Sequence, residues 1–248
     1  MVTRSHMALS PGEMAYIWVA FLAIFGPIVL GDVLIRRRRA ARGRRLRAWA
    51  DERGWRFDQA DGELTAFVTS LLDGQRPARH RLLVRDLLVR DDGDLAVYSF
   101  TYMWQWTDDR LRTAVRSRGE RFGAHTAHVV AVPLGRIVPR VQVTPEGPPT
   151  GLARALGGQD IQLESAEFNR AFRILADDPR AAHAVLHPRL MQRLLDEPGR
   201  SASWRIDHGW VFAWVDGGTK VEQILPMLDV VTAVRASLPT FVGTRPVA

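Results

Sequence analysis

The 248-residue chain contains no cysteine. This absence excludes a disulfide framework, a zinc site with cysteine ligands, a catalytic thiol and a lipid-modified N-terminal cysteine, and it is typical of a reducing compartment. Lysine is almost absent too, since Lys220 is the single lysine among 34 basic residues. Because arginine supplies the positive charge everywhere in the chain, we attribute its abundance to base composition rather than to selection for phosphate contacts.

Three signatures of common enzyme classes are also missing. The sequence contains neither G-x-x-x-x-G-K-[ST] nor G-x-G-x-x-G, so it has no phosphate-binding loop for ATP or for a dinucleotide. It contains no G-x-S-x-G, the turn that carries the nucleophile of many serine hydrolases. The sequence therefore predicts no cofactor and gives no direct indication of an enzyme.

One long apolar run is present, from Met14 to Ile35. A helix of this length reaches about 33 Å, which matches a hydrocarbon core of ~30 Å. Tyr16 and Trp18 stand where aromatic residues gather at a membrane interface. Positive residues follow this run instead of preceding it, which argues against a cleaved signal peptide. We therefore expect a transmembrane helix at 14–35, after a flexible tail at 1–13.

The arginines after this run predict the orientation of the helix. Arg36, Arg37, Arg38 and Arg39 follow it directly, and a basic juxtamembrane helix is expected over 36–53. The excess of basic residues on this side predicts a single-pass protein of the cell membrane with a cytoplasmic C-terminal domain. The net charge of +7 falls entirely within residues 1–47, and residues 48–248 are neutral. We therefore expect contact with anionic inner-leaflet lipids and no nucleic-acid partner.

The rest of the chain alternates between strand and helix patterns and predicts an α+β fold. Hairpins are expected at 81–106, with a turn at 91–94, and at 204–215, with a turn at His208-Gly209. Helices are expected at about 179–186, at 188–195 and after a capping box of Thr219 and Glu222. In the second strand of the first hairpin, aromatic residues alternate, so a strand places all five on one face: Tyr98, Phe100, Tyr102, Trp104 and Trp106. We predict antiparallel sheets whose aromatic inner faces are covered by helices, with a pleckstrin-homology-like partial barrel as a variant. Pro133 favours a sheet edge for its strand.

Two halves are expected in this part of the chain, 54–145 and 146–248, on either side of a stretch rich in proline and glycine. Within them the stretches WADERGWRF and LGGQDIQLESAEFNRAFRILADDPRAAHAVLHPRLMQRLL, together with the tryptophan-containing hairpin, resemble a family of uncharacterised bacterial single-pass membrane proteins. The resemblance covers most of residues 45–240. It implies an architecture, and no activity comes with it.

Four residues form a weak candidate site. His183 and His187 have the i, i+4 spacing of metal ligands on a helix, but Pro188 disfavours helical geometry at His187, and no metal site is predicted. Asp177 and Asp178 have the chemistry of an acid and base pair, whereas a residue before Pro179 is also a natural helix cap. No catalytic residue is assigned.

Two functions remain open at this stage. The first is a membrane-anchored, non-enzymatic cytoplasmic module that binds a protein or lipid partner near the inner leaflet. The alternative is a membrane-proximal, hydrolase-like enzyme that uses Asp177, Asp178, His183 and His187.

Overall fold

A computed structural model describes residues 11–58, 80–91, 93, 95–106, 125–147 and 159–239. Within these ranges, the side chains of 11–29, 32, 80–82, 104–106, 125 and 159 are not described. The chain forms two compact units, Met1–Arg45 and Leu46–Ala248. Helix α1 (Pro11–Glu52) begins in the first unit and ends in the second.

The first unit contains the expected membrane segment. Among the residues that the structure describes, no helix has a stretch both long and apolar enough to cross a membrane. The transmembrane helix expected at 14–35 stays a prediction, because most of its side chains lie outside the described ones. Tyr16, Trp18 and the other side chains at 14–29 lie outside the described ones. Arg36, Arg37, Arg38 and Arg39 are described, and all four are exposed on α1.

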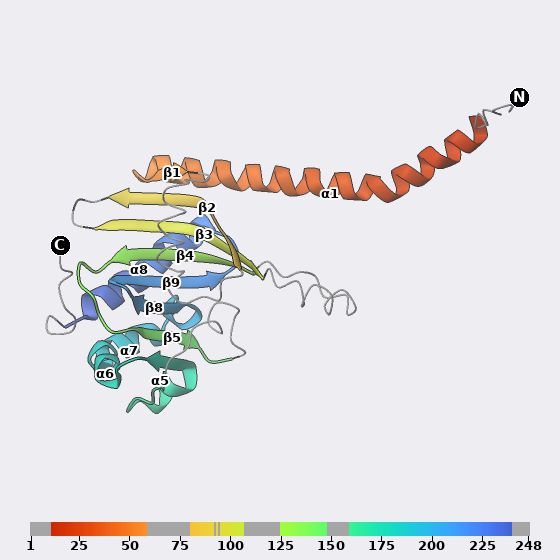
Figure 1. The fold of residues 1–248 in the computed structure, drawn as a ribbon. Helices are drawn as coiled ribbons and strands as arrows, with labels where there is room; N and C mark the ends of the chain where they lie inside the picture. The colour runs from red at the N-terminus through yellow and green to blue at the C-terminus, as the bar shows by residue number, and fades with distance from the viewer. Residues whose placement is uncertain are drawn as a thin grey trace, which may run out of the picture. The chain divides into compact units, whose positions relative to one another are not determined.

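The second unit is built on a nine-stranded sheet in the order β1-β2-β3-β4-β9-β8-β5-β7-β6, in which every neighbouring pair is antiparallel. The strands are β1 (Arg56–Asp58), β2 (His80–Asp91), β3 (Ala96–Trp106), β4 (His125–Pro133), β5 (Val141–Pro145), β6 (Gln159–Asp160), β7 (Phe172–Ala176), β8 (Ser203–Asp207) and β9 (Trp210–Asp216). Figure 1 shows β9 and β8, in blue, between β4 and β5, in green. An antiparallel α+β fold is confirmed.

The strand order also answers two finer expectations. The pleckstrin-homology-like barrel is not confirmed, because β1 and β6 are the two ends of the described sheet and do not pair with each other. The edge position expected from Pro133 is wrong: β4 pairs with both β3 and β9. Pro133 is the last residue of β4, where a missing backbone N–H interrupts the ladder least.

Both predicted hairpins are present. His208 and Gly209 have φ angles of 47° and 78°, as a two-residue type I′ turn between β8 and β9 requires. The β2–β3 hairpin contains a register shift between Arg85 and Leu88, and Asp86 inside it has a positive φ of 53°. An extra residue of this kind bends the strand and lets Leu87 and Leu88 both be buried.

Short helices follow β6 and β7, and a long one follows β9. They are α5 (Ala166–Ala171), α6 (Pro179–Val185), α7 (Pro188–Leu195), the 3-10 helix Gly199–Ser201, and α8 (Val221–Ser237). The side chain of Asp178 accepts a hydrogen bond from the backbone N–H of Arg180 and begins α6. Gly199 is required by a close approach, since a Cβ atom there would stand 2.8 Å from Cα of Leu194.

The main hydrophobic core joins one face of the sheet to these helices. Alternate residues of the central strands, among them Val130, Trp204 and Val211, pack with Phe168, Leu194 and Val231 of the helices. Leu46 and Ala50, at the end of α1, belong to the same cluster and are almost fully buried. The residues with odd numbers in β9 and even numbers in β4 and β8 therefore face the helices.

The opposite face carries a separate aromatic cluster. It consists of Val84, Leu87, Phe100, Tyr102, Ala127, Val129, Ala131, Phe212 and Trp214, all buried. The alternation in β3 correctly predicted that Phe100 and Tyr102 share a buried face with Tyr98, whereas the side chains of Trp104 and Trp106 lie outside the described ones. None of the described helices contributes to this cluster. The expectation that helices cover the aromatic rows is therefore not met by the described helices, which pack on the other face.

Candidate functional site

A polar patch continues the aromatic face across the sheet. Side chains alternate between faces along a strand, so Arg205 of β8, whose neighbours Trp204 and Ile206 face the helices, points to the aromatic side. Cross-strand pairing places Phe212 of β9, Arg205, Gln142 of β5 and Leu175 of β7 in one row. We define the polar patch as Arg140, Gln142, Ser203, Arg205 and Asp207.

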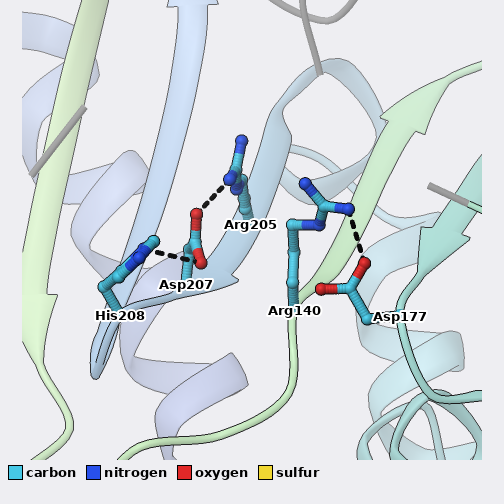
Figure 2. A network of polar contacts seen from close by, with 5 residues as sticks. All are labelled: Arg140, Asp177, Arg205, Asp207 and His208. Atoms are coloured by element: carbon cyan, nitrogen blue, oxygen red, sulfur yellow. Dashed lines mark hydrogen bonds and ion pairs between the residues drawn. The ribbon is translucent and has the colours of Figure 1, made fainter. Parts of the chain in front are cut away.

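Ion pairs hold the charged members of the patch (Figure 2). Arg205 donates to the carboxylate of Asp207, and the other carboxylate oxygen of Asp207 lies 2.9 Å from Nδ1 of His208. Arg140 donates to Oδ1 of Asp177 at 2.5 Å. The side chains of Arg205, Asp207 and Arg140 are 8%, 14% and 15% exposed. Two arginines and two aspartates therefore balance their charges, and of the four only Asp177 is exposed, at 51%.

Burial changes the protonation energetics of Arg205. Loss of hydration lowers its pKa, and the neighbouring carboxylate of Asp207 opposes this by attraction and by its hydrogen bond. The charge of Arg140 lowers the pKa further, while Asp177 raises it. Arg205 thus interacts electrostatically with the second ion pair as well as with its own partner, and the four groups act as one network.

Gln142 is the unusual member of the patch. It is 2% exposed, and neither its amide oxygen nor its amide nitrogen has a hydrogen-bond partner. The indole N–H of Trp214, on the same face and paired in register with Ser203, also has none. A buried polar group without a partner costs about 1–3 kcal/mol. Such groups need an explanation. Single atoms of this kind also occur at Trp55, His128 and Trp204, but Gln142 has two of them beside two ion pairs, and we therefore take the polar patch as the candidate site.

A second polar cluster lies on the helix side of β3 and β4. Oγ of Ser99 and Nε2 of His128 are 2.9 Å apart, and both residues are fully buried. Burial lowers the pKa of His128 to about 4, and an interaction with the side chain of Gln223 partly offsets this effect. A serine beside a neutral histidine resembles part of a catalytic triad, but both side chains are 0% exposed.

Thr101 extends this second cluster toward α8. Its hydroxyl oxygen accepts a hydrogen bond from the backbone N–H of Thr219 at 2.9 Å, and the two threonine hydroxyls are also 2.9 Å apart. Oδ2 of Asp86 accepts from Thr101 at 3.3 Å. Thr219 is therefore engaged with β3, and the capping box predicted from Thr219 and Glu222 does not form: α8 begins after Lys220 without a side-chain cap.

The four residues of the sequence-based candidate site have separate positions. Asp177 pairs with Arg140, and Asp178 caps α6. His187 caps α7, with Nδ1 3.4 Å from the backbone nitrogen of Leu190, while His183 is exposed on α6. Among the side chains that the structure describes, no three His, Cys, Asp or Glu residues are arranged to hold a metal ion. The catalytic hypothesis for these residues stays a prediction.

Sequence reasoning did not single out Arg205 or Gln142. A signal for Arg205 exists in the pattern Trp204-Arg-Ile-Asp207, which places charged residues on alternate positions of a strand with apolar neighbours. Gln142 stands in the same way between Val141 and Val143. What the sequence lacks is the strand order, which alone brings β5 beside β8.

Comparisons with known proteins add a partial family match. Residues 127–206, from β4 into β8, match a family described as a protein of unknown function (DUF3137). This region includes Arg140, Gln142, Ser203 and Arg205 of the polar patch. No curated protein matches the sequence. The expected resemblance to an uncharacterised family is thus supported for part of the chain.

One solved structure is similar in outline. It is the crystal structure of the mycobacterial trehalose monomycolate transport factor A, TtfA, with 12% sequence identity and a TM-score of 0.49. The similarity covers 79% of this chain and 96% of that chain. With so low an identity and score, this likeness assigns neither a ligand nor a partner to the present chain.

Proposed function

We propose that this chain is a membrane-anchored, non-enzymatic module that binds a lipid or protein partner near the inner leaflet, with its second unit in the cytoplasm. The observation that supports this proposal most directly is the exposure of apolar side chains in the described part of α1. Leu30, Val33, Leu34 and Ile35 are 59%, 40%, 45% and 48% exposed. Successive helical residues differ by about 100°, so Val33, Leu34 and Ile35 point in three directions. Together with Leu30 they cover about 200° of the helix circumference, as expected for side chains that contact lipid near the end of a membrane span.

The basic residues that follow support the same proposal. Arg36, Arg37, Arg38 and Arg39 are exposed immediately after this apolar segment. Each basic residue near an anionic surface contributes roughly 1 kcal/mol of attraction. The apolar run from Met14 to Ile35 in the sequence is long enough for a single span, and the arginines orient it with positive charge on the cytoplasmic side.

The test compares the full chain with two charge variants of equal size. In the first, Arg36, Arg37, Arg38 and Arg39 are replaced by glutamine. In the matched control, four exposed arginines of α5, α6 and α7 are replaced by glutamine: Arg170, Arg180, Arg189 and Arg193. Each protein is assayed for topology in cells and for flotation with liposomes made with and without phosphatidylglycerol.

We expect only the juxtamembrane variant to lose its uniform orientation and its preference for phosphatidylglycerol. Deletion of 14–35 should release the protein from membranes at alkaline pH. A wild-type chain that alkaline carbonate extracts completely would refute the proposed span. An unchanged orientation and lipid preference in the juxtamembrane variant would refute the role of the arginines.

A further inference from the structure

We propose that the polar patch around Gln142 binds an uncharged, hydroxyl-bearing group. The patch lies in the second unit, on residues 140–142 and 203–207, and does not depend on the membrane span proposed above. It therefore remains testable whether or not the anchor is correct. The inference depends on three features of the patch: its unmet hydrogen bonds, its charge balance and its gradient of exposure.

The unmet hydrogen bonds define what a ligand must supply. The amide of Gln142 offers an acceptor and two donors side by side, and none of them is used within the protein. The indole N–H of Trp214, on the neighbouring strand pair of the same face, requires an acceptor. A hydroxyl group donates and accepts at once and turns to suit either partner. Neighbouring hydroxyls are therefore the simplest match to these three atoms.

The charge balance argues against an ionic ligand. Arg140 and Arg205 flank Gln142, and each has a carboxylate partner, Asp177 or Asp207. A bound anion would add an uncompensated charge to a largely buried site, unless it displaced one of these carboxylates, and a cation would do the same with opposite sign. Placing an unpaired charge in such surroundings is costly. A neutral ligand meets the unmet hydrogen bonds without this cost.

The exposure of the side chains rises steadily away from Gln142. Gln142 itself is 2% exposed, Asp207 and Arg140 are 14% and 15% exposed, and Asp177 and His208 are 51% and 55% exposed. The polar groups thus extend from His208 at the β8–β9 turn, through the ion pairs drawn in Figure 2, toward Gln142, which is paired in register with Arg205. The approach is therefore polar, and the unmet hydrogen bonds of Gln142 lie at its buried end.

The neighbouring strand offers apolar contact to the same ligand. Trp210, Phe212 and Trp214 of β9 stand in register with Asp207, Arg205 and Ser203 of β8. Aromatic rings beside hydrogen-bonding groups are the usual composition of a site for a small, partly apolar molecule. The hydroxyl-bearing group can belong to a free polyol or to the headgroup of a lipid, and the experiment separates these sources.

The test uses the full chain in phosphatidylcholine nanodiscs and three probes. Glucose is the free hydroxyl probe, glucose 6-phosphate is its anionic counterpart, and a monoglucosyl diacylglycerol in the nanodisc is the lipid-linked form. Binding is measured by calorimetry for the soluble probes and by protection from amide hydrogen exchange for all three. The variants are Gln142→Leu and Trp214→Phe, and Gln223→Leu on α8 is the matched control.

We expect saturable binding of glucose or of the glucosyl lipid, with protection at β5 and β8 and at least tenfold weaker binding to Gln142→Leu. Trp214→Phe should weaken binding as well, and Gln223→Leu should bind as the wild type does. Gln142→Leu should unfold at an unchanged or higher temperature, because it removes unpaired buried groups. If it fails to fold, Trp214→Phe decides the matter.

Three results would overturn the inference. The first is that a folded wild-type chain binds neither neutral probe. The second is that wild type and Gln142→Leu bind a neutral probe with equal affinity, and the third is that glucose 6-phosphate binds more tightly than glucose. Flotation of the same samples with liposomes reports the membrane anchor separately, so failure of this site and failure of the proposed function give different results.

Discussion

Acidification should destabilise the second unit through His128. The unfolded state takes up a proton near pH 6.5, whereas native His128 stays neutral until about pH 4 because burial lowers its pKa. The unfolded state therefore binds more protons between these values, and stability falls as the pH decreases from about 6.5 to about 4. At about 1.4 kcal/mol for each pKa unit, the loss reaches about 3 kcal/mol and then levels off.

The assay is urea unfolding of the full chain in nanodiscs, followed by tryptophan fluorescence. It is repeated at pH values from about 7, above the pKa of histidine in the unfolded state, down to about 4, the pKa of native His128. His128→Gln keeps a hydrogen-bonding group opposite Ser99 and removes the titration. Its stability should depend less on pH than that of wild type, with the difference growing toward acid. His183→Gln, at an exposed histidine, is the control. Parallel pH profiles for wild type and His128→Gln would refute the reasoning.

Three further substitutions test contacts that fix the helices. Arg136 donates to the carbonyl oxygens of Leu238 and Pro239 after α8 at 3.0 and 2.8 Å. Arg136→Ala should therefore lower the unfolding free energy by about 1–3 kcal/mol, and an unchanged chemical denaturation curve would contradict this role. Thr101→Val should lower the unfolding free energy by about 1–3 kcal/mol because it leaves the N–H of Thr219 unpaired, while Thr101→Ser should lower it much less. Equal losses in the two variants would argue against a stabilising role for this hydrogen bond. Asp178→Ala should cost about 1 kcal/mol through loss of the α6 cap and Asp178→Asn only a fraction of that, as measured by thermal unfolding; a stable Asp178→Ala protein would exclude the cap.

Local patterns predicted the elements of the fold with good accuracy. The turn at His208-Gly209, the helices opened by Pro179 and Pro188, and the alternation of Tyr98, Phe100 and Tyr102 all depend on residues close together in the chain. Turn geometry, the fixed φ of proline and the two-residue period of a strand act at this range. The antiparallel α+β class follows from the same signals.

Contacts between segments far apart in the chain could not be predicted from these local patterns. Pro133 indicates that a backbone donor is missing, but not that β9, about 80 residues later in the chain, pairs with β4 on its far side. Thr219 and Glu222 have the spacing of a capping box, yet the hydroxyl of Thr101, on a distant strand, takes the N–H of Thr219. In both cases a tertiary partner overrides a valid local preference, and a single sequence does not name that partner.

The two polar clusters show the same limit for function. Spacing drew attention to Asp177, Asp178, His183 and His187 because they are close in sequence, and three of them have structural partners: Asp177 pairs with Arg140, and Asp178 and His187 cap helices. Gln142 and Arg205, which are far apart in sequence, lie side by side because β5 pairs with β8. Unmet hydrogen-bonding capacity appears only when the neighbours of a side chain are known. A search for sites in chains of this kind should therefore begin with buried polar groups on the sheet face, and with motifs only afterwards.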